Sequence, residues 1–159
     1  MNKIGDADAP AISSYQLRQF QELVMGLFQC CQERMQYQSE RFGLPDAELR
    51  CLLLFGSQRY LTPKSIARML NVTKSRVTKL VDGLITRGLV QRVKDPEDSR
   101  VYLLSLTPSG QEIWTRVTAF MEQVNREVLS RMPEAGRQNL LSSLILLKES
   151  MEAVKEMME

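Results

Sequence analysis

The sequence has 159 residues, about one domain's length, since single domains usually span roughly 100 to 200 residues. It contains no histidine, which excludes Ser-His-Asp and Cys-His nucleophile pairs, imidazole general bases and zinc sites with mixed Cys/His ligands. Hydrophobic residues make up 43% and charged residues 25%, values close to those of average globular proteins, so we expect the chain to bury a core.

The charge is unevenly distributed, although the net charge is only +2. Between Arg59 and Tyr102, ten basic residues stand against four acidic ones, a net charge of +6, which leaves −4 for the rest of the chain. A basic middle flanked by acidic ends is typical of a module that binds a polyanion and is attached to a scaffold that does not.

The chain shows no sign of membrane insertion or export. The longest apolar runs, residues 51–55 and 144–147, are far shorter than the roughly 20 residues of a transmembrane helix. Residues 1–11 are polar and acidic, unlike a secretory signal, so we expect a cytoplasmic protein without a membrane partner. Three cysteines, two of them adjacent, fit reduced thiols better than a disulfide framework.

The first long helix is predicted after Ser13, because Gln16 stands three residues further on, as a capping box requires. Gly43 ends it after Phe42. The apolar stripe of this helix is formed by Leu17, Phe20, Val24, Leu27, Cys31 and Met35. At about 1.5 Å per residue the helix is roughly 42 Å long, so we expect part of the stripe to pack against another subunit.

Two shorter helices are predicted next. The first runs from residues 44–46 to about Gly56. The second starts at Thr62, followed by Pro63, a hydroxyl N-cap before a proline, and ends at Asn71, a residue that suits a left-handed helix stop. Its buried side is expected to comprise Ile66, Ala67, Met69 and Leu70.

Thr73 predicts the start of the next helix, which ends near Gly88, so the two helices form a helix-turn-helix. The outward positions of the second helix offer groups that can touch phosphates and base edges: Lys74, Ser75, Arg76, Thr78, Lys79 and Asp82. Residues 89–93 and 101–106 read as two short strands around a polar loop, which makes the whole unit a winged helix.

The end of the chain is predicted to be helical, with an interruption at Pro133. A heptad seam of nearly three repeats follows, and it requires a partner: Leu140, Leu144, Leu147, Met151, Val154 and Met158. The fold class is therefore mainly α with a small β-hairpin wing, a winged helix-turn-helix with terminal dimerisation helices. We divide the chain into a flexible N-terminus (1–12), a winged helix-turn-helix (44–107) and a helical dimerisation region (13–43 and 108–159).

Four stretches in order resemble the MarR family of bacterial winged-helix transcriptional regulators. They are residues 72–84 (VTKSRVTKLVDGL), 87–92 (RGLVQR), 95–100 (DPEDSR) and 104–110 (LSLTPSG). The resemblance implies a homodimer with a recognition helix of each subunit in a major groove and each wing along the flanking backbone or minor groove. Such a dimer binds a palindromic operator with half-sites about one helical turn, roughly 10 base pairs, apart.

The resemblance implies repression of a promoter, relieved by a small molecule or an oxidant. We assign DNA contacts to Lys64, Thr73, Lys74, Ser75, Arg76, Thr78, Lys79, Lys94, Ser99 and Arg100. Arg76 is assigned to base readout, and Thr73, Ser75 and Lys79 to phosphates. Many relatives carry arginine where Ser99 stands, so Arg100 and Lys94 remain as the wing cations. Asp98 is expected to orient Arg100 or Arg92.

The signal that the protein senses has two candidate sites. An effector pocket for a small aromatic or phenolic carboxylate is implied by the resemblance, and we assign to it Phe28, Gln32, Arg34, Arg50 and Trp114. A thiol response is the alternative, with Cys30 as the accessible cysteine, whereas Cys31 and Cys51 are expected in the core because they continue apolar patterns.

Other functions find less support in the sequence. An enzyme is not expected, since no general base stands near the cysteines and no glycine-rich phosphate loop is present. No metal site and no cofactor are expected either. A winged-helix adaptor that binds protein instead of DNA is the remaining alternative, and the +6 charge of the middle segment argues against it. Salt-sensitive binding to duplex DNA would separate the two.

Overall fold

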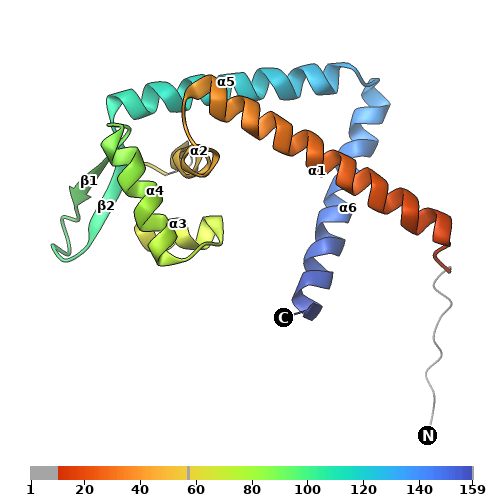
Figure 1. Ribbon diagram of the computed structural model, residues 1–159, viewed down its shortest axis with the longest axis horizontal. Coiled ribbons are helices and arrows are strands. Elements are labelled where there is room, and N and C mark those ends of the chain that lie inside the picture. Colours follow the sequence, from red (N-terminus) through yellow and green to blue (C-terminus); the bar gives the residue numbers. More distant parts are fainter. Residues whose placement is uncertain (1–10, 57, 159) are drawn as a thin grey trace, which may run out of the picture. The chain divides into compact units, whose positions relative to one another are not determined.

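The computed structural model describes residues 11–56 and 58–158 (Figure 1). It divides into two compact units, the first ending at Gly110 and the second starting at Gln111. The predicted flexible N-terminus lies outside the described residues, except for residues 11 and 12. Within the described part of the chain, no helix is both long enough and apolar enough to cross a membrane.

The long first helix, α1 (Ser14–Phe42), begins at the predicted capping box. The Gln16 amide donates to Ser13 Oγ at 3.2 Å, and the Ser13 amide donates to Gln16 Oε1 at 3.0 Å. Gly43 ends the helix in the left-handed conformation, with φ of 63°. These hydrogen bonds satisfy backbone groups that a helix end leaves unpaired, so the local sequence defines both ends of α1.

Three helices follow in the first unit. They are α2 (Asp46–Leu53), extended by the 3₁₀ turn η1 (Leu54–Gly56), then α3 (Pro63–Leu70) and α4 (Lys74–Thr86). Thr62 and Ser65 cap α3 reciprocally, Asn71 ends it with φ of 53°, and Thr73 caps α4. The helix-turn-helix predicted from the sequence is confirmed.

The wing is an antiparallel hairpin of β1 (Val90–Lys94) and β2 (Tyr102–Leu106). Each strand begins one residue later than the sequence predicts. An additional bridge joins Leu61 to Leu104 through two backbone hydrogen bonds of 3.0 and 2.8 Å. The segment before α3 therefore holds the wing against the helical part of the same unit.

The hydrophobic core of the first unit lies between Leu44 and Leu104. Figure 1 shows α2, α3 and α4 in one group with the hairpin beside α4, and the contacts of these elements agree. The largest fully buried side chains of this unit are Leu49, Cys51, Leu52, Leu61, Ile66, Val77, Leu84 and Leu104.

The expectation that Met69 belongs to the core is wrong, because its side chain is 43% exposed. The helix α3 packs against α4 on one side, so it buries a narrow stripe. Ile66 and Leu70, four positions apart, lie close to that stripe, whereas Met69 lies about 60° from Ile66 around the helix axis.

The connection from the wing into the next helix, α5 (Pro108–Ser130), requires a residue without a side chain. A Cβ added to Gly110 would overlap the carbonyl oxygen of Leu89. Thr107 fixes this turn, since its hydroxyl donates to the Gly88 carbonyl at 2.5 Å and accepts the Gly110 amide at 3.0 Å. The start of α5 is thereby fixed to Gly88 and Leu89, which follow directly after α4.

The second unit comprises the rest of α5 and α6 (Glu134–Met158), separated by Pro133. Val117 of α5 is buried, whereas α6 has no buried residue at all. The heptad seam on α6 is largely exposed in the single chain, with Leu144 43% and Met151 53% exposed. The residues that the structure describes therefore leave the apolar seam of α6 unburied.

Candidate nucleic-acid interface

The helix α4 has one apolar and one polar face. Its apolar face is buried and consists of Val77, Leu80, Val81 and Leu84. All of the outward positions predicted from the sequence are exposed: Lys74, Ser75, Arg76, Thr78, Lys79 and Asp82. Because the buried face fixes the helix on α2 and α3, the polar face is held toward solvent in one orientation.

The hydroxyl groups at the start of α4 already have partners inside the helix. Thr73 Oγ1 accepts the Arg76 amide at 3.3 Å and lies 3.1 Å from Ser75 Oγ. Thr78 Oγ1 donates to the Lys74 carbonyl at 3.2 Å, so its proton is used by the helix. Phosphate oxygens accept hydrogen bonds, and therefore Thr78 would have to release this bond to donate to a phosphate.

The cations of this face are available to an anion. The side-chain nitrogens of Lys74, Arg76 and Lys79 form no hydrogen bond or ion pair with any residue that the structure describes. Lys64, exposed on α3, is likewise without a described partner. Unpaired cations on a rigid helix attract a polyanion without first having to break an internal ion pair.

The wing carries its own exposed cation. The Arg100 side chain is 90% exposed, and its Nε donates to Asp98 Oδ1 at 3.2 Å. The Arg100 amide donates to the same oxygen at 3.0 Å, so Asp98 holds both the backbone and the side chain of Arg100. Lys94 ends β1 and Ser99 lies in the loop, and both are exposed.

The Arg92 side chain contacts α4 rather than Asp98. Its Nη2 donates to Asp82 Oδ1 of α4 at 2.9 Å, and its guanidinium lies 5.2 Å from the centre of the Tyr102 ring. Both partners of the ion pair are about half exposed. Arg92 therefore links the wing to α4, a contact that the sequence pattern does not indicate.

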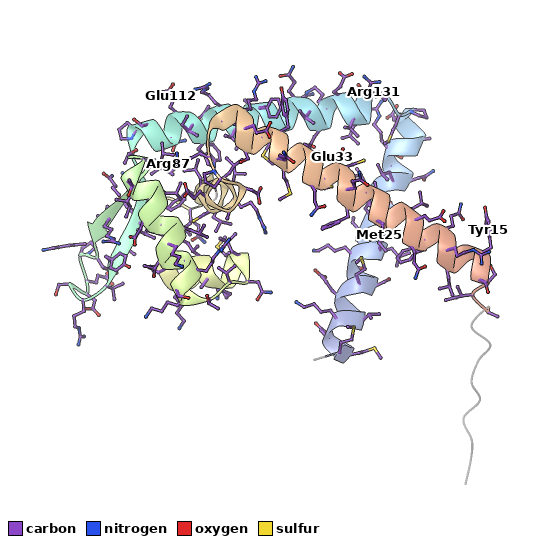
Figure 2. The ribbon with its side chains drawn as sticks, viewed as in Figure 1. Tyr15, Met25, Glu33, Arg87, Glu112 and Arg131 are labelled. Atoms are coloured by element: carbon purple, nitrogen blue, oxygen red, sulfur yellow. The ribbon has the colours of Figure 1, made fainter. Side chains whose placement is uncertain are left out.

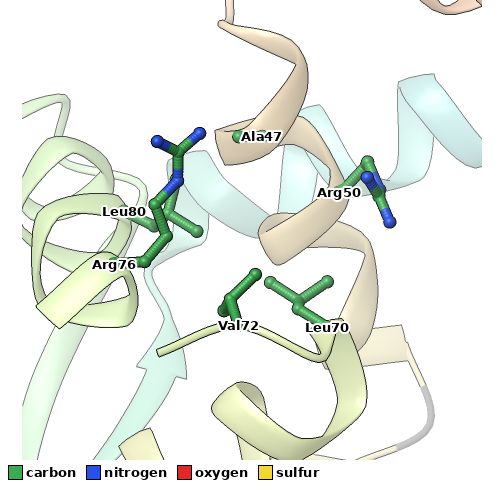
Figure 3. Close-up of a pocket in the computed structure, with 6 residues that line it drawn as sticks. All are labelled: Ala47, Arg50, Leu70, Val72, Arg76 and Leu80. Carbon is green, nitrogen blue, oxygen red and sulfur yellow. The ribbon is translucent and has the colours of Figure 1, made fainter. Parts of the chain in front are cut away.

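One of the residues expected in the effector pocket lies close to the recognition helix. A pocket of about 90 Å³ is lined by Ala47, Arg50, Leu70, Val72, Arg76 and Leu80 (Figure 3). The guanidinium groups of Arg50 and Arg76 point to opposite sides of it. Arg50, on α2, therefore lines the same pocket as Arg76 of α4.

The other residues expected in the effector pocket lie elsewhere in the chain. Phe28, Gln32 and Arg34 are exposed residues of α1 and do not line the pocket beside Arg76. Trp114 belongs to the second unit, and its buried indole N–H has no hydrogen-bond partner among the described residues.

The three cysteines have different surroundings. Cys30 and Cys31 are exposed on α1, so the expectation of a core position for Cys31 is wrong within the single chain. The apolar stripe to which Cys31 belongs is largely exposed in the single chain, since Leu17, Phe20 and Leu27 are each about half exposed. Cys51 is fully buried, as expected, and burial raises its pKa from the ordinary value of 9.0 to about 12, with a smaller contribution from the Glu48 carboxylate.

The arrangement has counterparts among known proteins. A MarR family model matches residues 42–101, from the end of α1 through the wing loop. The chain is 31% identical over 120 residues to the HTH-type transcriptional repressor YetL of Bacillus subtilis, an alignment that covers 67% of this chain and 71% of YetL. The chain belongs to the MarR family. The relatives YetL and MdtR of Bacillus subtilis are HTH-type transcriptional repressors.

Solved structures share the fold of this MarR-family chain. The crystal structure of YusO from Bacillus subtilis is 29% identical and has a TM-score of 0.65, with 88% of this chain and 99% of YusO covered. Streptococcus pneumoniae FabT, solved in complex with DNA, is 21% identical and has a TM-score of 0.76, with 87% and 99% covered. At that identity, the likeness to FabT shows the fold alone.

Proposed function

We propose that this MarR-family regulator is a homodimer that binds a palindromic operator and represses transcription until a small organic ligand releases it. The observation that carries the proposal is the exposed face of α4, where three cations without described partners stand on a helix with a buried apolar base. DNA complexes of structural relatives, such as that of FabT, support the same use of the fold.

Each DNA contact has a distinct role in this proposal. Arg76 reads a base edge in the major groove, because its guanidinium can donate two hydrogen bonds to guanine. Ser75, Lys79 and the cap residue Thr73 contact phosphates, which fix the register of the helix on the duplex. Lys64, Lys74, Thr78, Lys94, Ser99 and Arg100 complete the set, with Arg100 at the wing.

The homodimer is supported by the uncovered apolar surface of the terminal helices. The α6 seam exposes Leu144, Met151 and Val154, and α1 exposes Tyr15 and Met25 (Figure 2). Monomeric soluble proteins rarely expose contiguous apolar surface of this kind. A second copy of the chain would bury both, and a two-fold dimer matches a palindromic operator.

The releasing signal is proposed to be a small aromatic or phenolic carboxylate, with Arg50, which lines the pocket at the start of α4, as the candidate anchor for its carboxylate group. A thermal-shift screen tests this, since a ligand that prefers the folded state raises the melting temperature. No stabilisation by phenolic acids at millimolar concentration would contradict it.

The exposure of Cys30 supports a second candidate, oxidation of this thiol. Peroxide should then abolish DNA binding in the wild type and not in Cys30→Ser.

Selection of duplexes from a random pool, followed by titration of the enriched duplex with salt, tests the proposal as a whole. We expect an inverted repeat and an affinity that falls steeply with salt, because each neutralised phosphate contributes about −0.9 to the logarithmic slope. Binding that ignored salt would favour the protein-interaction adaptor instead.

A further inference from the structure

Arg87 joins three segments of the first unit at one point. It follows the last residue of α4, and Figure 2 labels it there. Its Nε donates to Glu48 Oε2 of α2 at 2.9 Å, and its Nη1 donates to the carbonyl of Gly43, the residue that ends α1, at 3.3 Å. The Glu48 side chain is only 14% exposed, so this ion pair is shielded from solvent on one side.

The Glu48 carboxylate also lies directly against the backbone of α4. A Cβ added to Gly83 would overlap Glu48 Oε1 and would lie 2.9 Å from Glu48 Cδ. Glycine in the middle of a helix is unfavourable compared with alanine, because it loses more backbone freedom on folding. The contact with Glu48 gives a reason for glycine at this position.

The contacts of Glu48 with Arg87 and Gly83 restrain the direction of α4, which the packing of its apolar face does not. The packing of Val77, Leu80 and Leu84 is not directional, whereas a hydrogen bond between charged groups is short and directional. Arg76 stands eleven residues before Arg87, roughly 16 Å along the axis at about 1.5 Å per residue. A tilt of about 10° at the Arg87 end would therefore move Arg76 by about 3 Å, the length of a hydrogen bond.

We propose that Glu48 and Arg87, with Gly83 providing the space, are positioning residues that set the orientation of the recognition helix relative to α2 and the end of α1. They act on base readout without touching DNA. The inference rests on the proposed DNA-binding function. It assigns a role to two charged residues and a glycine that lie outside the predicted interface.

The test compares Glu48→Gln and Gly83→Ala with the wild type on two duplexes at one salt concentration. One duplex is the sequence that the wild type selects from a random pool, and the other is its scrambled version. Glu48→Gln removes the charge and keeps the shape, whereas Gly83→Ala keeps both charges and displaces the carboxylate. Glu127→Gln, which removes the exposed ion pair between Glu127 of α5 and Arg131, is the matched control.

We expect Glu48→Gln and Gly83→Ala each to lower the affinity for the selected duplex roughly five- to 150-fold, the range of one base contact. Affinity for the scrambled duplex should change less than twofold, because the phosphate-binding cations remain. Glu127→Gln should change neither. Unchanged affinity for the selected duplex, or equal losses on both duplexes, would overturn the inference.

A loss of folding in Glu48→Gln would not prevent the test. Arg87→Lys keeps the charge but loses the planar fork that reaches Glu48 and the Gly43 carbonyl together, and it should show the same selective loss. The selection experiment distinguishes failure of the DNA-binding function from failure of the positioning role. If the wild type enriches no duplex, the DNA-binding function is wrong, and if it enriches one that all variants bind equally well, only the positioning role is wrong.

Discussion

At the scale of single residues, Cys51 differs from the other two cysteines in its surroundings. It is fully buried among leucines, and its raised pKa keeps the thiol protonated at neutral pH. The thiolate is the reactive form of cysteine, so Cys51 should resist alkylation in the folded protein. We expect iodoacetamide at pH 8 to modify Cys30 and to reach Cys51 only after denaturant is added. Rapid labelling of Cys51 without denaturant, detected by peptide mass spectrometry, would contradict this expectation.

The same thiol predicts how stability depends on pH. The unfolded chain releases the proton near the ordinary pKa of 9.0, whereas the folded chain retains it up to a pKa of about 12. Between these values the unfolded state binds fewer protons, so the free energy of unfolding falls as pH rises, by up to about 1.4 kcal/mol per pH unit. Well below pH 9 this contribution is fully present.

Chemical denaturation of the wild type and Cys51→Ala at pH 8, 9 and 10 measures this effect. The stability advantage of the wild type should fall by about 0.4 kcal/mol from pH 8 to 9 and by about 1 kcal/mol from pH 9 to 10. An advantage that is equal at all three pH values would show that Cys51 does not titrate differently in the two states.

Arg76 and Lys79 are expected to contribute to DNA binding in different ways. Arg76→Ala should lower discrimination between the selected and the scrambled duplex by about 1 to 3 kcal/mol, because a base contact is lost. Lys79→Ala should weaken binding to both duplexes equally and reduce the salt slope by about 1. Fluorescence anisotropy at several salt concentrations measures both effects. If Arg76→Ala left the ratio of the two affinities unchanged, Arg76 would not read a base.

At the scale of the elements, the ends of the helices depend on single hydroxyl groups. Thr73 caps α4 by accepting the Arg76 amide, so Thr73→Ala should lower the free energy of unfolding by about 1 kcal/mol. Thr86, the last residue of α4, is exposed and caps nothing, and Thr86→Ala serves as the control. Equal effects of the two variants in urea unfolding would contradict the role of the cap.

The same local signals explain how much of the fold could be predicted. The hydroxyl caps and the ends at Gly43 and Asn71 are encoded within a few residues, so the predicted helices agree closely with the observed ones. The bridge between Leu61 and Leu104 joins residues 43 positions apart, and no local pattern indicates it. The exposure of Met69 was missed for a similar reason, since periodicity does not show how wide a stripe the neighbouring helix covers.

In the candidate site, too, the features set by local sequence could be predicted, and those that depend on the tertiary structure could not. The polar face of α4 follows from helical spacing alone and was predicted in full. The contacts of Arg87 with Glu48, of Arg92 with Asp82 and of Arg50 with the pocket beside α4 depend on tertiary approach. An arginine in a sequence shows its charge and not its partner, so these contacts required the structure.

At the scale of the whole molecule, the α6 seam should decide the oligomeric state. Leu144→Glu places a charge in the proposed interface, and burial of an unpaired charge is strongly unfavourable. The residue is 43% exposed in the single chain, so the isolated subunit should still fold. We expect analytical ultracentrifugation to show a monomer that binds the selected duplex weakly. Ser142→Glu, about 160° away around α6, should remain a dimer, and a dimeric Leu144→Glu protein would exclude this seam as the interface.

The hydrophobic core is confined to one part of the chain, and this affects the order in which the protein folds and assembles. Nearly all of the buried apolar side chains lie between Leu44 and Leu104, within one continuous stretch of chain, while α6 buries none. Contacts between residues close in sequence form quickly, so the winged helix should fold at a rate independent of protein concentration. In the proposed homodimer, recovery of operator binding after dilution from denaturant should instead become faster as the protein concentration rises, because each subunit must first bind a second chain. Each new subunit would then be folded before it is functional, and its cellular concentration would set the delay.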